Sequence, residues 1–168
     1  DLLRDQILLH GFEVLDNGDD FSFRTKSPFP IYERIGALRS FTDKEFSISV
    51  ALILDSFIED AMASIEAIKK YSPADTAILV VVCGTPDLSS LALHIDDRTF
   101  IVQIAVAPGW GETANQILKS APSSHLVIMD PSTIFTGDAI SPVLELLQRG
   151  EYSAVGWRGG LINLADEW

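Results

Sequence analysis

The sequence contains one cysteine, few basic residues and no long apolar run. The single thiol, Cys83, excludes an internal disulfide and fits a reducing compartment, so we expect a cytoplasmic protein. No apolar stretch approaches the roughly 18 residues of a membrane-spanning helix, and no secretory signal pattern is present, so we expect no membrane segment. Lys and Arg number 12 against 24 Asp and Glu, and the formal charge of −12 argues against nucleic acid as a partner.

Apolar residues are nevertheless plentiful. They make up 47% of the 168 residues, against 21% charged, which predicts a globular domain with a substantial core. We expect an N-terminal helix, hairpin and linker over 1–46 and an α/β domain over 47–168, because the pattern changes between them. The chain starts at Asp1 rather than Met and closes on an acidic stretch, so we expect a piece of a longer protein, truncated at its C-terminal end.

The first part of the chain predicts small local elements. Apolar residues at helical spacing precede Gly11, which indicates a short helix. Apolar runs on either side of Asn17-Gly18 predict a β-hairpin, because this pair tolerates positive φ. Residues 27–40 carry two prolines without a clear period, and we interpret them as a linker.

The second part alternates apolar runs with helical stretches. The runs lack polar alternation, as strands do when both faces of a sheet are covered, and the stretches between them are long enough for crossover helices. The expected architecture is α/β, a three-layer sandwich with a mostly parallel central sheet. The predicted strands are SISVALIL (47–54), AILVVVC (77–83), TFIVQIAV (99–106), HLVIM (125–129) and YSAVGW (152–157).

Two of the expected helices carry start or stop signals. Ser56 and Glu59 match a capping box, in which both side chains satisfy free backbone donors. The last helix is framed by Pro142 at its start and Gly150 beyond its end, where each residue is tolerated. The core face of the first helix is predicted to hold Phe57, Ala61, Ile65 and Ile68.

Several site patterns are weak. The three histidines stand isolated from other ligand types, so a zinc site is not favoured. Residues 109–114 match the dinucleotide pattern G-x-G-x-x-A, but two strand-helix units precede them and Glu112 would bring a carboxylate near the pyrophosphate. A tight turn is the favoured interpretation. Cys83 is interpreted as a small residue closing a strand rather than as a nucleophile.

Parallel sheets bind ligands beyond the carboxyl ends of their strands, so the strand ends are the candidate site. Asp130 taken alone is most simply a turn residue or a helix cap, since Asp-Pro commonly starts a turn. Its surroundings favour a functional role for Asp130, because residues 47–157 resemble the nucleotide-binding half of the family-2 glycosyltransferases. The resemblance lies in the order and spacing of Asp55-Ser56, Cys83-Gly84-Thr85-Pro86-Asp87, Gly109 with Asn115, and Asp130-Pro131-Ser132.

The resemblance implies a Rossmann-like type A fold that binds a nucleotide-diphosphate sugar and, in the full-length protein, transfers the sugar to a hydroxyl acceptor. It assigns Asp130 to the donor and to a divalent metal ion, Mn²⁺ or Mg²⁺, and leaves the catalytic base unknown. The substrate-binding residues that it implies are Asp55, Ser56, Cys83, Gly84, Asp87, Gly109, Asn115, Asp130 and Ser132.

The departures from the family pattern support an alternative. Ser132 stands at the second acidic position of the metal-binding Asp-x-Asp, Cys83 at the acid that reads the base, and Ala114 at the usual arginine. The alternative is therefore a non-catalytic transferase-like module for binding or assembly, and a homo-oligomer is compatible with either hypothesis. The acids near the end, Asp166 and Glu167, are interpreted as a solvated tail. For Trp110 and Trp157, buried packing is favoured over stacking on a ligand.

Overall fold

The structure is a computed structural model that describes residues 12–16, 21–25, 29–84 and 89–156. Near the N-terminus, β1 (Phe12–Asp16) pairs antiparallel with β2 (Phe21–Thr25), which confirms the predicted hairpin. The expected helix before Gly11 and the Asn17-Gly18 turn lie outside the described residues. No helix in the described part of the chain combines the length and the apolar character that crossing a bilayer requires.

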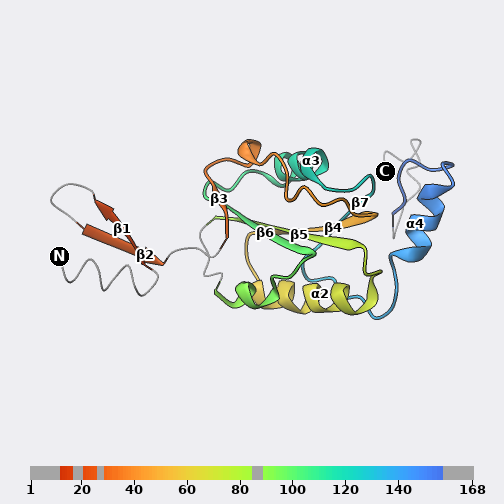
Figure 1. Cartoon of the computed structure of the whole chain (residues 1–168), viewed down its shortest axis with the longest axis horizontal. Helices are drawn as coiled ribbons and strands as arrows, with labels where there is room; N and C mark the ends of the chain where they lie inside the picture. Colours follow the sequence, from red (N-terminus) through yellow and green to blue (C-terminus); the bar gives the residue numbers. More distant parts are fainter. Residues whose placement is uncertain (1–11, 17–20, 26–28, 85–88, 157–168) are drawn as a thin grey trace, which may run out of the picture.

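The main body is a five-stranded sheet in which every strand pairing is parallel (Figure 1). Its order is β3-β6-β5-β4-β7. All of β5 is buried, and so is nearly all of β4, as predicted for strands covered on both faces. The strands are β3 (Ile31–Tyr32), β4 (Ile48–Leu54), β5 (Thr76–Cys83), β6 (Thr99–Ile104) and β7 (Leu126–Met129).

The fifth strand is not the predicted one. Residues 152–156 form no strand and are exposed, while Trp157 lies outside the described residues. The edge position is taken instead by β3, inside the segment 27–40 that was predicted to be a linker. The Gln103 N–H donates to the Pro30 carbonyl at 2.9 Å and holds this short segment beside β6. A strand of two residues is too short to produce a recognisable apolar pattern, so it could not be predicted from the sequence.

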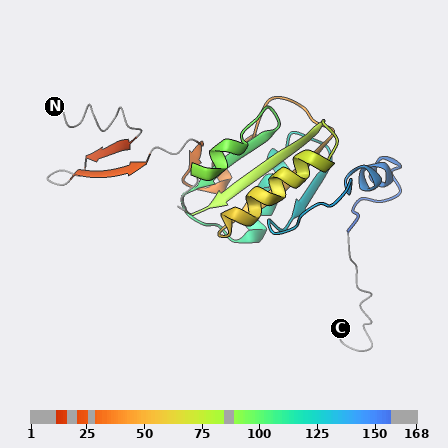
Figure 2. The same ribbon diagram turned by 90° about the horizontal axis from the view of Figure 1, so that it is seen from below.

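Helices cover both faces of the sheet. On one face lie α2 (Ile58–Tyr71), which follows β4 in the chain, and the 3₁₀ helix η2 (Ser89–His94), which follows β5 (Figures 1 and 2). We expected a crossover α-helix in the place of η2. On the other face lies α3 (Trp110–Ser120), between β6 and β7, beside the 3₁₀ helix η1 (Ile35–Ala37). The arrangement is the predicted Rossmann-like three-layer α/β sandwich.

Each face of the sheet has its own apolar core, because successive strand residues point to opposite sides. Burying these side chains is the main stabilising contribution to the fold. The α2 side includes Val50, Leu52, Val80, Ile65 and Ile68, and the α3 side includes Ala51, Leu79, Val81, Leu38 and Ile117.

The start of α2 differs from the prediction. The predicted capping box is wrong, because the Ser56 hydroxyl donates to Asp55 Oδ1 at 2.9 Å and the helix begins only at Ile58. The capping position belongs to Phe57, which is left-handed with φ 56° and ψ 55°. This turn points the Phe57 ring away from the core face, so 72% of Phe57 is exposed. The other three predicted core residues of this helix are buried: Ala61, Ile65 and Ile68.

The last described helix, α4 (Ser141–Gln148), begins and ends as predicted. Pro142 lies in its first turn, where a missing N–H costs nothing, and Gly150 follows it with φ 73°. Asp138 Oδ1 accepts the N–H groups of Ile140 at 3.0 Å and Ser141 at 2.9 Å, which satisfies donors at the start of the helix.

Candidate functional site

The strand order contains a point of reversal between β4 and β7. The chain steps from β4 to β5 to β6 in one direction and then returns to place β7 on the other side of β4. Because parallel crossovers are right-handed, the reversal sends α2 and α3 to opposite faces of the sheet. The loops after β4 and β7 therefore diverge and leave a crevice, which is where open parallel sheets bind ligands.

A cavity of about 720 Å³ lies at this point, within the size range of small-molecule sites. Its floor is apolar, formed by residues at the ends of β4 and β7 such as Ile53 and Met129. Two aromatic side chains, Phe57 and Trp110, line it from the starts of α2 and α3. Its polar lining consists of Asp55, Ser56, Asp60, Asp130 and Ser132.

Four of the predicted site residues thus meet in one cavity. Asp55 and Ser56 follow β4, whereas Asp130 and Ser132 follow β7, about 75 positions later. The parallel register of β4 and β7, with Leu52 opposite Met129, brings the two pairs to the same edge of the sheet. The strand-end argument placed the residues after all the central strands in one candidate site, and the cavity is lined by those after β4 and β7 and by Trp110 at the start of α3.

Asp130 is both a turn residue and a cavity residue. Its Oδ1 accepts the Ser132 N–H at 2.9 Å and the Ser132 hydroxyl at 2.5 Å, and its carbonyl accepts the Thr133 N–H at 3.0 Å. These two bonds from Ser132 lower the pKa of Asp130, because they favour the charged carboxylate. The carboxylate is therefore ionised at neutral pH. Its Oδ2 forms no hydrogen bond with any described residue and remains available to a ligand.

The cavity is strongly acidic. Asp55, Asp60 and Asp130 line it, and no Lys, Arg or His does so among the described residues. Such a lining favours neutral or cationic groups and opposes a bare phosphate. The described residues also hold no group of three or more His, Cys, Asp or Glu side chains placed to bind a metal ion. The Asp130–Ser132 arrangement is therefore not a complete protein-made cage for Mn²⁺ or Mg²⁺, which take several hard oxygen ligands.

Of the other predicted site residues, the four that the structure describes, Cys83, Gly84, Gly109 and Asn115, do not line the cavity. Cys83 is buried at the end of β5, and burial raises the pKa of its thiol despite a hydrogen bond with Thr113. Gly84 follows it with φ 94°, and its carbonyl accepts a hydrogen bond from Gln103 Nε2 at 3.0 Å. Both residues thus shape the end of β5.

Gly109 is the residue before α3, and Asn115 is exposed on that helix outside the cavity. One predicted site residue, Asp87, lies outside the described part of the chain, and so do Asp166 and Glu167, which were interpreted as a solvated tail.

The sequence analysis did not assign Phe57, Asp60 or Trp110 to the site. Phe57 was placed in the core, and for Trp110 buried packing was favoured over stacking on a ligand, yet both side chains are exposed in the cavity. Asp60, in the first turn of α2, was not considered. For Trp110 a signal was present, since it stands between two glycines, a few positions after a predicted strand. Such a position is typical of a loop that faces a ligand rather than of a core.

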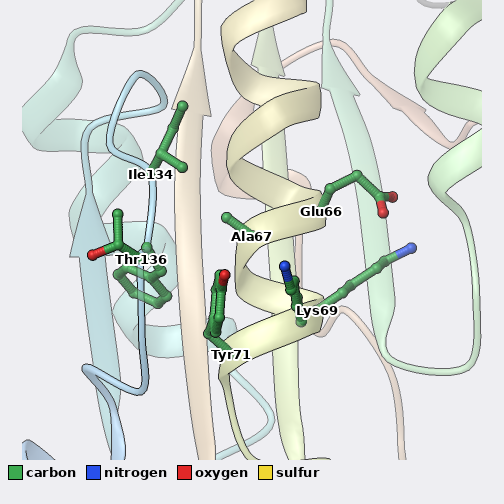
Figure 3. A pocket seen from close by; sticks show the side chains of 8 residues that line it. Glu66, Ala67, Lys69, Tyr71, Ile134 and Thr136 are labelled. Carbon is green, nitrogen blue, oxygen red and sulfur yellow. The ribbon is translucent and has the colours of Figure 1, made fainter.

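A second hollow, of about 680 Å³, lies beside the last turns of α2 and residues 134–136 (Figure 3). It is at the amino ends of the strands, opposite to the edge where parallel sheets bind ligands. Its basic residues already have partners. Lys69 Nζ lies 2.9 Å from Asp96 and donates to the His94 carbonyl at 2.7 Å, and Lys70 Nζ lies 4.8 Å from the centre of the Tyr71 ring. Neither lysine therefore needs a ligand in the hollow to pair its charge.

Comparison with known proteins adds no relative. No protein-family model matches the chain, and no curated protein matches it in sequence. The functional argument therefore rests on the fold and on the residues of the cavity.

Proposed function

We propose that this domain binds a nucleotide-diphosphate sugar in the cavity at the ends of β4 and β7, and that the full-length protein transfers the sugar to a hydroxyl acceptor. One observation carries the proposal. The residue pairs Asp55-Ser56 and Asp130-Ser132, whose order and spacing resemble the family-2 glycosyltransferases, lie in a single cavity of about 720 Å³. A cavity of this volume at a point of strand reversal is the usual nucleotide position in such sheets.

The proposal gives two features of the cavity, the start of α3 and Asp130, a role in this chemistry. Displacement at the anomeric carbon leaves a diphosphate, whose growing charge needs a stabilising positive field. The backbone N–H groups at the N-terminus of α3, which begins at Trp110 on the cavity wall, contribute to that field, and Glu112 in the same first turn opposes it. Asp130 Oδ2 can accept a hydrogen bond from a ribose or sugar hydroxyl. The base that takes the acceptor proton is expected from another part of the full-length protein.

A second candidate function is a non-catalytic module that binds a sugar or nucleotide without transferring it. The Asp130 carboxylate is engaged twice by Ser132, and the described residues include no three-ligand acidic or histidine cluster. This arrangement favours binding over metal-assisted transfer. The two candidates share the cavity and differ in whether donor cleavage follows binding.

Calorimetric titration with uridine, guanosine and thymidine diphosphate sugars, each with and without Mn²⁺, tests the proposal. We expect one donor class to bind. Asp130→Ala should lower the affinity for this donor about tenfold or more, as expected for the loss of a charge-assisted hydrogen bond. Asp97→Ala is the matched control, because Asp97 is an exposed acid that does not line the cavity. A sample with a normal folded circular dichroism spectrum that binds none of these donors would overturn the proposal.

Donor turnover separates the two candidates. The full-length protein should release nucleoside diphosphate from the bound donor when a hydroxyl acceptor is present. Tight donor binding without any release, with or without Mn²⁺, would favour the non-catalytic module.

A further inference from the structure

Trp110 occupies an unusual position on α3. Residues three, four and seven positions after it, Thr113, Ala114 and Ile117, are all buried against the sheet, so Trp110 belongs to the inward-facing stripe of the helix. It is nevertheless 66% exposed. The reason is that the first turn of α3 reaches the carboxyl ends of the strands, where the cavity lies in place of a packed core.

This exposure calls for an explanation in terms of a ligand. A buried indole removes about 150–250 Å² from water, and leaving it at the wall of a cavity forgoes that stabilisation. Leu118 on the same helix is 65% exposed but does not line the cavity, as is normal for an isolated apolar residue on a surface. Trp110 differs from it because it faces a cavity of ligand size.

The charges around Trp110 limit which part of a ligand it can meet. The described polar residues of the cavity include Asp55, Asp60 and Asp130 and no cationic side chain. A phosphate beside three carboxylates would be repelled, whereas an uncharged ring with hydroxyl or amide N–H groups could donate hydrogen bonds to them. The flat indole face suits the apolar face of such a ring.

We infer that Trp110 is a ligand-contacting residue whose indole stacks on an uncharged ring of the ligand, either a nucleobase or a sugar ring. The inference deepens the proposed function and takes its ligand class from it. The carboxylates of Asp55, Asp60 and Asp130 accept hydrogen bonds from the polar edge of the same ring. Stacking on Trp110 then favours ligands that carry such a ring, and the diphosphate of the ligand lies away from the carboxylates.

The test compares Trp110→Ala, Trp110→Phe and the control Leu118→Ala by calorimetry. Four kinds of ligand are titrated in each of the uridine, guanosine and thymidine series: the nucleotide-diphosphate sugar, its nucleoside, its nucleoside diphosphate and its free monosaccharide. We expect Trp110→Ala to lower the affinity for the nucleotide sugar about fivefold or more, the usual effect of losing one stacking partner. Trp110→Phe should retain most of the affinity, and Leu118→Ala should bind like the unaltered chain. The smaller ligand that loses affinity with Trp110→Ala identifies the stacked ring.

The outcomes separate this inference from the proposed function. If Trp110→Ala binds the nucleotide sugar as tightly as the unaltered chain, the inference fails and the proposed function stands. If a nucleoside or monosaccharide binds in a Trp110-dependent way but no nucleotide sugar binds, the proposed function fails and the inference stands. If the folded chain binds none of the four kinds of ligand, both fail. Because Trp110 is mostly exposed, its substitution should leave the free energy of unfolding nearly unchanged.

Discussion

Asp130 and Ser132 are joined by two hydrogen bonds at the edge of the cavity, one from the Ser132 N–H at 2.9 Å and one from its hydroxyl at 2.5 Å, both to Asp130 Oδ1. At this position Ser132 supplies two hydrogen-bond donors to the Asp130 carboxylate, whereas an acid would supply a second carboxylate to a metal ion. The serine therefore changes the role of the whole Asp-x-Ser segment. It holds one oxygen of Asp130 within the turn and leaves the other without a hydrogen bond to any described residue.

Removing the Ser132 hydroxyl should raise the pKa of Asp130 toward its ordinary value. Ser132→Ala deletes the largest cause of the lowered pKa and keeps the backbone N–H, whereas Ser132→Thr keeps both donors. A carbon-detected NMR titration of the Asp130 carboxyl measures this directly. An unchanged pKa in Ser132→Ala would contradict the hydrogen bond.

The same pair predicts a pH dependence of stability. Because the pKa of Asp130 is lower in the folded state than in the unfolded state, its contribution is present above the unfolded pKa and is lost as pH falls through the folded pKa. The stability difference between the unaltered chain and Ser132→Ala should therefore be found near neutral pH and vanish in acid. The effect should be small, since Asp130 is exposed.

Phe57 should tolerate glycine better than alanine. Its left-handed conformation, with φ 56°, costs an L-residue with a Cβ about 1–2 kcal/mol that glycine does not lose. Phe57→Gly should therefore be more stable than Phe57→Ala by about 1 kcal/mol in urea unfolding, and the difference isolates the backbone because both variants remove the ring. Equal stability of the two variants would mean that Phe57 is not left-handed in solution.

Asp138 should stabilise the start of α4. Its Oδ1 accepts the N–H groups of Ile140 and Ser141, so Asp138→Ala should cost about 1 kcal/mol, the usual effect of losing a capping side chain. Since no residue of α4 is fully buried, we expect the loss as faster amide exchange of α4 rather than as global unfolding. Asp138→Asn retains an acceptor and should protect most of these amides. Equal exchange in all three proteins would exclude the cap.

Cys83 should be nearly unreactive in the folded chain. It is buried, and burial raises the pKa of its thiol, so both access and thiolate population are low. A disulfide reagent at neutral pH should modify the native protein at least about tenfold more slowly than the urea-unfolded chain. If Cys83 is labelled rapidly and a bound nucleotide sugar prevents the labelling, Cys83 is accessible and lies within the ligand site.

The local pattern of the chain was sufficient for most of the elements. The apolar runs of β4 and β5 need no partner to be recognised, because strands covered on both faces are apolar at every position. The Pro142 and Gly150 signals of α4 act within one or two residues, so they could be recognised without tertiary information.

One error lies within a local turn, and the other falls where distant segments decide the outcome. The capping box at Ser56 fitted the local rule, yet the Ser56 hydroxyl pairs with Asp55 and the turn takes a left-handed Phe57. The short strand β3 exists only because β6 offers an open edge. Local propensity cannot predict contacts that form between segments about 70 residues apart along the chain.

Four of the five parallel strands, the layers of helices and the two acid-bearing turns at strand ends could be predicted from the amino-acid pattern, because they follow from short-range periodicity and from the handedness of crossovers. The folded chain was needed to see that the turns after β4 and β7 share one cavity without Cys83, and that Phe57 and Trp110 line it. This is because a cavity forms where close packing of side chains ends. The place where packing ends depends on strand order, which brings β7 beside β4 rather than beside β6.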